Sequence, residues 1–198
     1  MQTDLPKPRD AASLLVLRHD AGTPQVLMAR RSAGHRFMPN VLVFPGGAVD
    51  PADYDAEVAT QLAPHVAARL ERSADPALAR ALAVAATREL TEEVGLSLGR
   101  PPPLGVLEYL CRAITPPDRQ IRFDARFFVV DAAHANGVLA GSDELADPDW
   151  YTVEAALAAD IPLATRAVLG CFQKWLVAAD RAGGQAVPVL RDREWSQE

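Results

Sequence analysis

The alternation of hydrophobic and polar residues along the chain predicts strands and helices that follow one another in turn. Short apolar runs rich in branched residues predict strands at 11–18, 25–30, 41–44, 104–114, 122–130 and 150–151. Apolar positions three and four residues apart predict helices at 52–73, with a break near Pro64, at 75–95 and at 162–182. Strands mixed with helices in this way predict an α/β fold in which one sheet is covered on both faces.

The helix predicted at 75–95 has the clearest limits. Asp75 and Pro76 are an N-cap and a first-turn proline, and Gly95 is a typical C-terminal stop. An apolar stripe at helical spacing runs along this helix and consists of Ala83, Ala86, Leu90 and Val94. Burial of that stripe fixes the direction in which the remaining side chains of the helix point.

The other face of this helix carries three acids close together. Glu89, Glu92 and Glu93 project within about 100° of one another, and Arg88 stands beside Glu92 at i,i+4. Like charges at this spacing cost a few tenths of a kcal/mol per pair, and the C-terminal end of a helix disfavours anions. A solvated acidic face is the simplest alternative. The unfavourable placement instead indicates a site for a hard divalent cation with oxygen ligands.

Residues 88–96 resemble the second half of the Nudix box, Gly-x5-Glu-x7-Arg-Glu-U-x-Glu-Glu-x-Gly-U, where U is aliphatic. The tetrapeptide Phe-Pro-Gly-Gly at 44–47 resembles the strand end and glycine loop that open this box. Gly47 stands 41 positions before Arg88, against 14 in the ordinary box, so about 27 residues are inserted. The first glutamate of the box, counted back from Arg88, falls on Arg80. That acid is therefore either absent or replaced by one from the insertion.

Further segments narrow the resemblance to a branch that includes the peroxisomal acyl-coenzyme A diphosphatases, which also carry an insertion inside the box. The similarity extends over about 11–180 and rests on the split box together with the segments 30–32, 37–40, 44–50 and 122–128. It implies a Nudix α/β/α sandwich with a mixed sheet and an inserted helical segment at about 52–73. We therefore expect a flexible lead-in at 1–10 and a single domain at 11–198.

Chemistry and resemblance together suggest roles for the acids. Hydrolysis of a diphosphate spreads negative charge over phosphate oxygens, so cations supply most of the catalysis. We expect Glu92 and Glu93 to be ligands of Mg²⁺ or Mn²⁺. Glu89 is a further ligand or the base that orients water, and Arg88 holds it in place. The resemblance adds the backbone carbonyl of Gly46 as a metal ligand, with an ordinary tight turn as the alternative.

Other candidate residues are less specific. Glu144 resembles a loop glutamate that acts as a base or added ligand in many Nudix enzymes, although a solvated loop acid fits as well. Arg30, Arg31 and Arg36 are candidate substrate-binding residues for phosphates, or plain surface residues. His35 in the same loop is expected to face solvent. A cross-strand ladder of ion pairs, favoured over a substrate contact, is predicted at Arg122, Asp124 and Arg126.

Composition excludes some classes of protein. The chain of 198 residues is 49% hydrophobic and 23% charged, as in a globular domain, and no apolar run approaches the ~18 residues of a membrane span. Cys111 and Cys171 show neither ligand spacing nor a disulfide framework, which favours a cytoplasmic protein. The net charge of −6 opposes binding to a nucleic acid polymer and also repels a diphosphate, so a metal must reverse the local field.

The sequence therefore predicts a metal-dependent enzyme that hydrolyses a diphosphate linkage in a nucleoside diphosphate derivative. Coenzyme A or an acyl-coenzyme A is the first candidate substrate, and a nucleotide-sugar, dinucleotide or oxidised nucleotide is the alternative. A noncatalytic nucleotide-sensing Nudix domain would be favoured by loss of box acids, but all three remain. An isomerase of small diphosphates would need an acid–base pair that neither cysteine supplies. The expected partner is a small-molecule diphosphate and no membrane, and the oligomeric state, with a homodimer as one option, stays open.

Overall fold

The computed structural model describes residues 7–32, 34, 39–178 and 186–198. In this part of the chain, one mixed sheet has the strand order β11-β10-β6-β7-β1-β2-β3, with β4 paired to β1 and β9 paired to β2. The β1/β7 and β10/β6 pairs are parallel, and the other pairs of this sheet are antiparallel. Its strands are β1 (Arg9–Asp20), β2 (Thr23–Arg31), β3 (Leu42–Val43), β4 (Gly46–Ala48), β6 (Glu108–Ile114), β7 (Phe123–Asp131), β9 (Leu145–Thr152), β10 (Pro188–Arg191) and β11 (Glu194–Gln197). A separate short ladder pairs β5 (Leu96–Ser97) with β8 (Asn136–Gly137).

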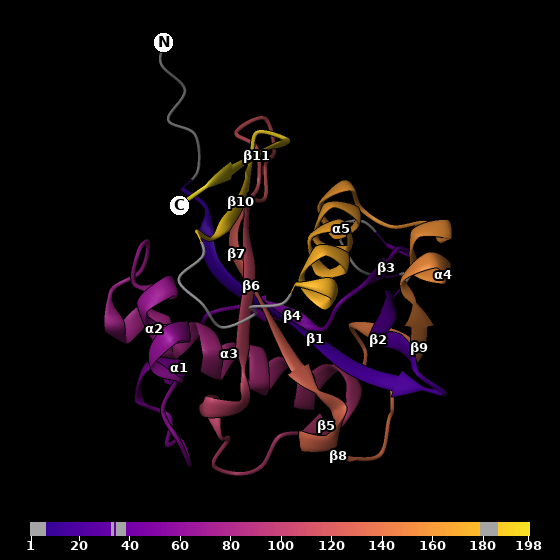
Figure 1. Cartoon of the computed structure of the whole chain (residues 1–198), viewed down its shortest axis with the longest axis horizontal. Coiled ribbons are helices and arrows are strands. Elements are labelled where there is room, and N and C mark those ends of the chain that lie inside the picture. The colour runs from indigo at the N-terminus through magenta and orange to yellow at the C-terminus, as the bar shows by residue number, and fades with distance from the viewer. Residues whose placement is uncertain (1–6, 33, 35–38, 179–185) are drawn as a thin grey trace.

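Helices lie on both faces of this sheet (Figure 1). One face packs against α2 (Pro64–Leu70) and α3 (Pro76–Val94), and α1 (Pro51–Asp55) contacts α3. The other face packs against α4 (Val153–Ala158) and α5 (Leu163–Val177). Successive residues of a strand point to opposite faces, so Leu14 joins the core beneath α3 while Leu15 joins the core beneath α5. The α/β/α sandwich with a mixed sheet that the sequence predicts is confirmed.

The limits of α3 are those that the sequence predicts. Asp75 accepts a hydrogen bond of 2.8 Å from the backbone N–H of Leu78 and so caps the first turn. Gly95 ends the helix with a φ of 74°, and a side chain there would also meet the carbonyl of Val138. Only glycine satisfies both conditions without strain. The predicted apolar stripe is fully buried at Ala83, Ala86, Leu90 and Val94.

The segment predicted to be helical at 52–73 is not one helix. Residues 56–63 between α1 and α2 are not helical, and Pro64 begins α2 instead of breaking a helix. Proline fits the first turn because the N–H that it lacks has no intrahelical partner there. The insertion therefore consists of two short helices joined by an irregular segment.

The C-terminal third also differs from expectation. The strand predicted at 150–151 is the end of the longer β9 and is not the last strand, since β10 and β11 follow. The helix predicted at 162–182 ends at Val177. The glycines expected to stop it, Gly183 and Gly184, lie outside the described residues. At the other end of the chain, β1 already begins within the predicted lead-in.

Hydrogen bonds fasten the insertion to the rest of the molecule. Arg80 of α3 donates to two carbonyls at the end of α1. Arg69 of α2 donates to the carbonyl of Tyr109 in β6 at 2.6 Å, and Arg126 of β7 donates to the carbonyl of Ser73 at 3.2 Å. Arg69 and Arg126 are themselves buried. The insertion is thus packed as a fixed part of the domain.

The alternating charges on β7 form cross-strand ion pairs, as the favoured interpretation predicts. Asp124 accepts two hydrogen bonds of 2.7 Å from Arg112 of β6, and Arg126 pairs with Asp10 of β1 at 2.8 Å. Arg122 donates to the carbonyl of Thr115 at 3.2 Å. Among the described residues, no helix combines the length and the apolar character needed to span a bilayer.

Candidate active site

The glycine loop and the acids of α3 lie against each other. β4 pairs with β1, and this pairing places the loop beside α3. The backbone N–H of Gly46 donates to Oε2 of Glu93 at 2.7 Å. A side chain at Gly47 would overlap the carboxylate of Glu89. Gly47 is required here because the loop backbone passes directly over Glu89, whereas a side chain at Gly46 would overlap Ser13 of the neighbouring strand β1.

Arg88 connects the acids of α3 to one another. Its Nη1 donates to Oε1 of Glu89 at 2.8 Å and to Oε2 of Glu92 at 3.0 Å. Its other nitrogens donate to the two carboxylate oxygens of Asp53 at 3.0 and 3.1 Å, and Nη2 also reaches the carbonyl of Ala48 at 3.1 Å. The hydrogen bonds to Asp53 are the main reason why the pKa of Arg88 is raised, so this side chain remains charged. The expected contact between Arg88 and Glu89 is present.

Asp53 is an acid of the predicted insertion that pairs with Arg88. The box spacing, counted back from Arg88 along the sequence, reaches Arg80 instead. The side chain of Asp53 is only 2% exposed, and it lies in α1, within the segment 52–73. Of the two alternatives for the first box glutamate, the pairing of Asp53 with Arg88 favours replacement by an acid from this segment. Counting forward from Gly47 by the spacing Gly-x5-Glu reaches the same residue, which is the signal that could have identified it. Arg80 instead binds the end of α1.

Burial and crowding make the carboxylates of this cluster poor acids. Burial raises the pKa of Glu93 to about 8 even though the hydrogen bond from Gly46 opposes the rise, and the charges of Glu89 and Glu144 add to it. Burial also raises the pKa of Glu89, against the effect of Arg88. The third acid of the helix face, Glu92, is 58% exposed. Burial of the two inner carboxylates, Glu89 and Glu93, therefore outweighs the effect of the groups that favour their charged forms.

Two residues predicted from other parts of the sequence lie near these acids. Arg31 at the end of β2 pairs with Leu145 of β9, and Glu144 precedes Leu145. Burial lowers the pKa of Arg31, whereas the charges of Glu93 and Glu144 act in the opposite direction. The pairing of β2 with β9 therefore brings Glu144 and Arg31 within electrostatic range of the box acids.

Arg30 is not part of this cluster. Arg30 is exposed and donates to the carbonyl of Asn40 at 3.2 Å. Arg36 and His35 lie outside the described residues, so their predicted roles stay predictions. Of the three candidate substrate-binding arginines, only Arg31 is described beside the acids.

The donor set of the site fits a hard divalent cation. Glu89, Glu92, Glu93 and Glu144 offer carboxylate oxygens, the ligands that such cations prefer, and burial together with the charges of Glu89 and Glu144 raises the pKa of Glu93. Within the described part of the chain, however, no three acidic, histidine or cysteine side chains converge as a ready-made metal site. Arg88 pairs with both Glu89 and Glu92. Metal ligation by Glu89, Glu92, Glu93 and Gly46 thus stays a prediction.

A hollow of about 250 Å³ opens on the outer side of α3. It lies between α1, α3 and the segment 99–102, and the contributions from the acid cluster are Asp53, Arg88 and Glu92. Arg100 also lines it. Because α1 belongs to the segment 52–73, the predicted insertion helps to build this wall.

Solved structures with a similar fold are Nudix proteins. A NUDIX hydrolase from Alicyclobacillus acidocaldarius matches with a TM-score of 0.66 and 27% identity, over 84% of this chain and 91% of that chain. The MutT protein from Methanosarcina mazei Go1 matches with a TM-score of 0.57 and 19% identity, over 88% and 100% of the two chains. The NUDIX domain of Shewanella oneidensis NrtR, solved with ADP ribose, matches with a TM-score of 0.59 and 13% identity, over 89% and 94%. No protein-family model matches the sequence.

The mixed sheet with helices on both faces is the fold of these Nudix proteins, and the match to the NUDIX hydrolase covers 84% of this chain. The similarity to a NUDIX hydrolase at 27% identity supports an enzyme of the Nudix type, a pyrophosphohydrolase. These structural likenesses do not distinguish the acyl-coenzyme A branch of the superfamily from its other branches.

Proposed function

We propose that this protein hydrolyses the diphosphate linkage of a nucleoside diphosphate derivative in a metal-dependent reaction, with coenzyme A or an acyl-coenzyme A as the first candidate substrate. The observation that carries this proposal is the half-buried carboxylate cluster of Glu89 and Glu93 against the Gly46–Gly47 loop. Buried carboxylates without enough cations are costly for a fold to maintain. A cation-assisted reaction on an anionic substrate supplies a reason to maintain them.

Each residue of the cluster has a task in this reaction. Glu92 and Glu93, with the carbonyl of Gly46, would hold Mg²⁺ or Mn²⁺. The bound cation would offset the charge that develops on the diphosphate oxygens as the P–O bond breaks. Glu89, held by Arg88 at 2.8 Å, would accept a proton from the attacking water. Glu144 is the alternative base, since it lies near the same acids.

The insertion would determine which diphosphates are accepted. It contributes α1 to the wall of the hollow on α3, next to Glu92. A group attached to the diphosphate can occupy this hollow while the diphosphate itself lies over the acids. The hollow has a volume of about 250 Å³, which offers room for part of such a group.

Coenzyme A carries an additional 3′-phosphate, which needs a cation in a chain whose net charge is −6. Arg31 is the described candidate, since it lies beside the acids. Arg31→Ala should raise KM for coenzyme A more than for 3′-dephospho-coenzyme A. The matched variant Arg30→Ala removes an exposed neighbouring arginine. It should change KM little for either substrate. Equal losses on both substrates with Arg31→Ala would assign this residue to the diphosphate or to structure.

The substrate is tested by incubating the protein with coenzyme A, ADP-ribose, a dinucleotide and a nucleotide-sugar in Mg²⁺ or Mn²⁺ and identifying the products by mass. The proposal predicts a 3′,5′-bisphosphorylated adenosine and 4′-phosphopantetheine. Faster turnover of ADP-ribose, the ligand of the NrtR domain, or of a dinucleotide would favour the alternative substrates. Binding without turnover of any of them would favour a nucleotide-sensing domain.

A further inference from the structure

A second hollow lies where the start of β1 meets α1. Its volume is about 470 Å³, larger than that of the hollow on α3. We call it the β1–α1 hollow, and its lining residues are Arg9, Asp10, Val49, Pro51 and Tyr54. Pro51 and Tyr54 lie one turn apart on α1, whereas Ala52, Asp53 and Ala56 face the hollow on α3. The two hollows therefore lie on different sides of α1.

Asp10 presents a fixed carboxylate to the β1–α1 hollow. Its Oδ1 accepts a hydrogen bond of 2.8 Å from Arg126 of β7, whose side chain is 1% exposed. Arg126 is held in turn by the carbonyls of Asp124 at 2.9 Å and Ser73 at 3.2 Å. The side chain of Asp10 is itself 39% exposed, so its carboxylate can also accept a hydrogen bond from a ligand.

Tyr54 gives the same hollow an aromatic wall. This residue is 43% exposed, and Val49 and Pro51 add aliphatic surface beside it. The backbone N–H of Val49 donates to the carbonyl of Asp10 at 2.9 Å, so the wall on the α1 side is joined to β1. An exposed ring beside a fixed carboxylate offers a flat ligand both a surface to stack on and an acceptor to bind.

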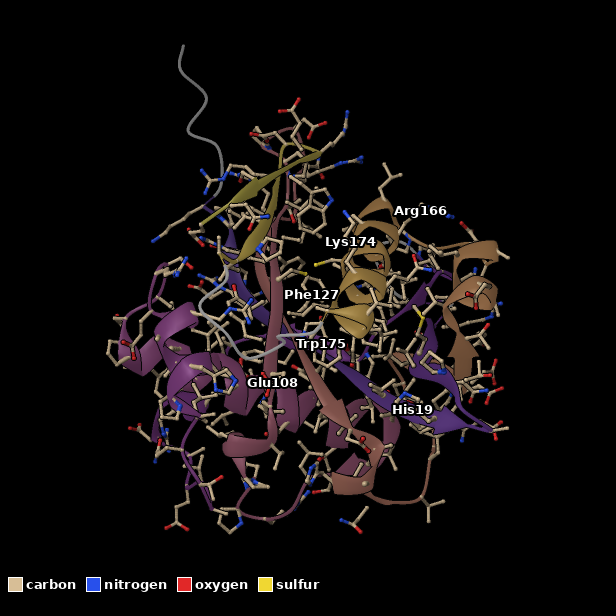
Figure 2. The ribbon with its side chains drawn as sticks, viewed as in Figure 1. His19, Glu108, Phe127, Arg166, Lys174 and Trp175 are labelled. Carbon is tan, nitrogen blue, oxygen red and sulfur yellow. The ribbon has the colours of Figure 1, made fainter. Side chains whose placement is uncertain are left out.

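The segment that carries Tyr54 is anchored to the rest of the domain. Asp53, the preceding residue, is 2% exposed, and Arg80 of α3 donates to the carbonyl of Tyr54 at 2.9 Å. The other helix of the insertion, α2, is joined to β6 by a contact of 2.9 Å between Nε2 of His65 and Oε2 of Glu108, which is labelled in Figure 2. The aromatic wall is therefore formed before any ligand arrives.

Arg9 adds an available positive charge to the hollow. It is exposed, and its backbone N–H donates to the carbonyl of Arg122 at 2.9 Å. Its side chain forms no hydrogen bond or ion pair with the residues that the structure describes. Asp10, the next residue, already pairs with Arg126, and Asp50 faces Arg88 at 3.8 Å. Arg9 is thus available to an anionic group of a ligand.

We propose that the β1–α1 hollow binds a nucleoside monophosphate, at a site separate from the acids of α3. The base stacks on Tyr54 and contacts the aliphatic surface of Val49 and Pro51. An amino group of the base donates to Asp10, and the phosphate pairs with Arg9. The volume of about 470 Å³ lies within the range of about 300–1,000 Å³ that is typical of ligand pockets.

Calorimetric titration of the full chain with AMP, adenosine and ribose 5-phosphate tests this proposal. The titrations are made in EDTA, which keeps divalent cations from the acids of α3. AMP should bind at least about tenfold more tightly than either of the other two compounds, because it alone carries both the base and the phosphate.

Substitutions assign each part of the ligand to its residue. Tyr54→Ala should reduce the affinity for AMP to that for ribose 5-phosphate, and Arg9→Ala should reduce it to that for adenosine. Tyr54→Phe keeps the ring and should bind AMP like the original protein. Arg119→Ala, which removes another exposed arginine, and Glu93→Gln should leave the affinity for AMP unchanged. Circular dichroism of each variant checks that the fold is kept.

Three results would overturn the proposal. The first is the absence of AMP binding at millimolar concentrations. The second is an affinity for AMP that neither Tyr54→Ala nor Arg9→Ala changes, or that Glu93→Gln abolishes, because the nucleotide would then occupy another site. The third is equal affinity for adenosine and AMP, because the phosphate would then make no contribution and the ligand would not be a nucleotide.

Discussion

Asp53 shows how one buried side chain arranges the residues around it. It lies in α1 and pairs with two nitrogens of Arg88, whose third nitrogen then reaches Glu89 and Glu92. The side chain of Arg88 is 23% exposed, so its charge is largely removed from solvent and depends on its ion-pair partners. Removal of one partner of a buried ion pair leaves the other charge buried without a partner. The resulting loss of stability is usually larger than the net stabilisation that the intact pair provides.

We therefore expect Asp53→Ala to lower the free energy of unfolding by about 3 kcal/mol. Urea denaturation followed by circular dichroism measures this change. Asp55→Ala, on the same short helix but exposed, is the matched control and should stay within about 0.5 kcal/mol of the original protein. Similar values for the two variants would mean that Asp53 does not organise Arg88.

Spacing along one helix predicts which residues share a face, and this is why the acids on α3 were found from the sequence. Glu144 and Arg31 reach the same acids only through the pairing of β2 with β9. That pairing joins segments more than a hundred residues apart, so no local pattern reveals it. The resemblance to Nudix enzymes identified Glu144 as a candidate. Only the structure shows that Glu144 lies near Glu93 and Arg31.

At the scale of elements, the insertion is the part of the chain that departs most from an ordinary box. Val66 and Leu70 on α2 are completely buried, and Arg69 and Arg126 tie α2 and the following turn to the sheet. An element held in this way is expected to act as a fixed wall. A variant shortened to the ordinary box length would expose these contacts, so point substitutions are the better probe.

Leu70→Ala should lower the free energy of unfolding by about 2–5 kcal/mol, since it removes a buried side chain and leaves a cavity. The proposed requirement for Mg²⁺ should not change, because Leu70 packs in the hydrophobic core. Glu71→Ala, the next residue and exposed, should have an effect of at most about 0.5 kcal/mol. If α2 were a loosely attached lid, both variants would leave stability unchanged.

The elements that the sequence predicts well are those with local signals. α3 has a cap, an apolar stripe and a glycine stop, and β1 and β2 are long enough for their apolar character to show. β4 and the β10–β11 hairpin escaped prediction because each spans only three or four residues. Their strand character depends on the neighbours to which they pair.

At the scale of the whole molecule, a chain with a net charge of −6 concentrates several of its acids at one half-buried place. Folding brings these carboxylates together, and in the unfolded chain they separate. A divalent cation that binds them would therefore bind the folded state in preference, and mass action would convert this preference into stability.

Added MnCl₂ should raise the Tm of the protein, with a stabilisation of about 2.7 kcal/mol when the free ion is at a hundred times its Kd. Excess EDTA should reverse the rise. Glu93→Gln should lose most of the shift, whereas Glu71→Gln, an exposed acid on the insertion, should keep it. A shift of equal size in both variants would place the ion elsewhere on the surface.

The most direct test of the central claim is the steady-state rate of diphosphate hydrolysis by Glu93→Gln at saturating Mg²⁺, on the substrate that the product analysis selects. The amide keeps the size of the side chain and can still accept from Gly46, but it loses the charge that would hold the metal. We predict a loss of at least about 10³-fold in kcat with the fold intact by circular dichroism, and a similar loss for Glu92→Gln. Turnover near that of the original protein in both variants would contradict the assignment of these acids as the catalytic metal site.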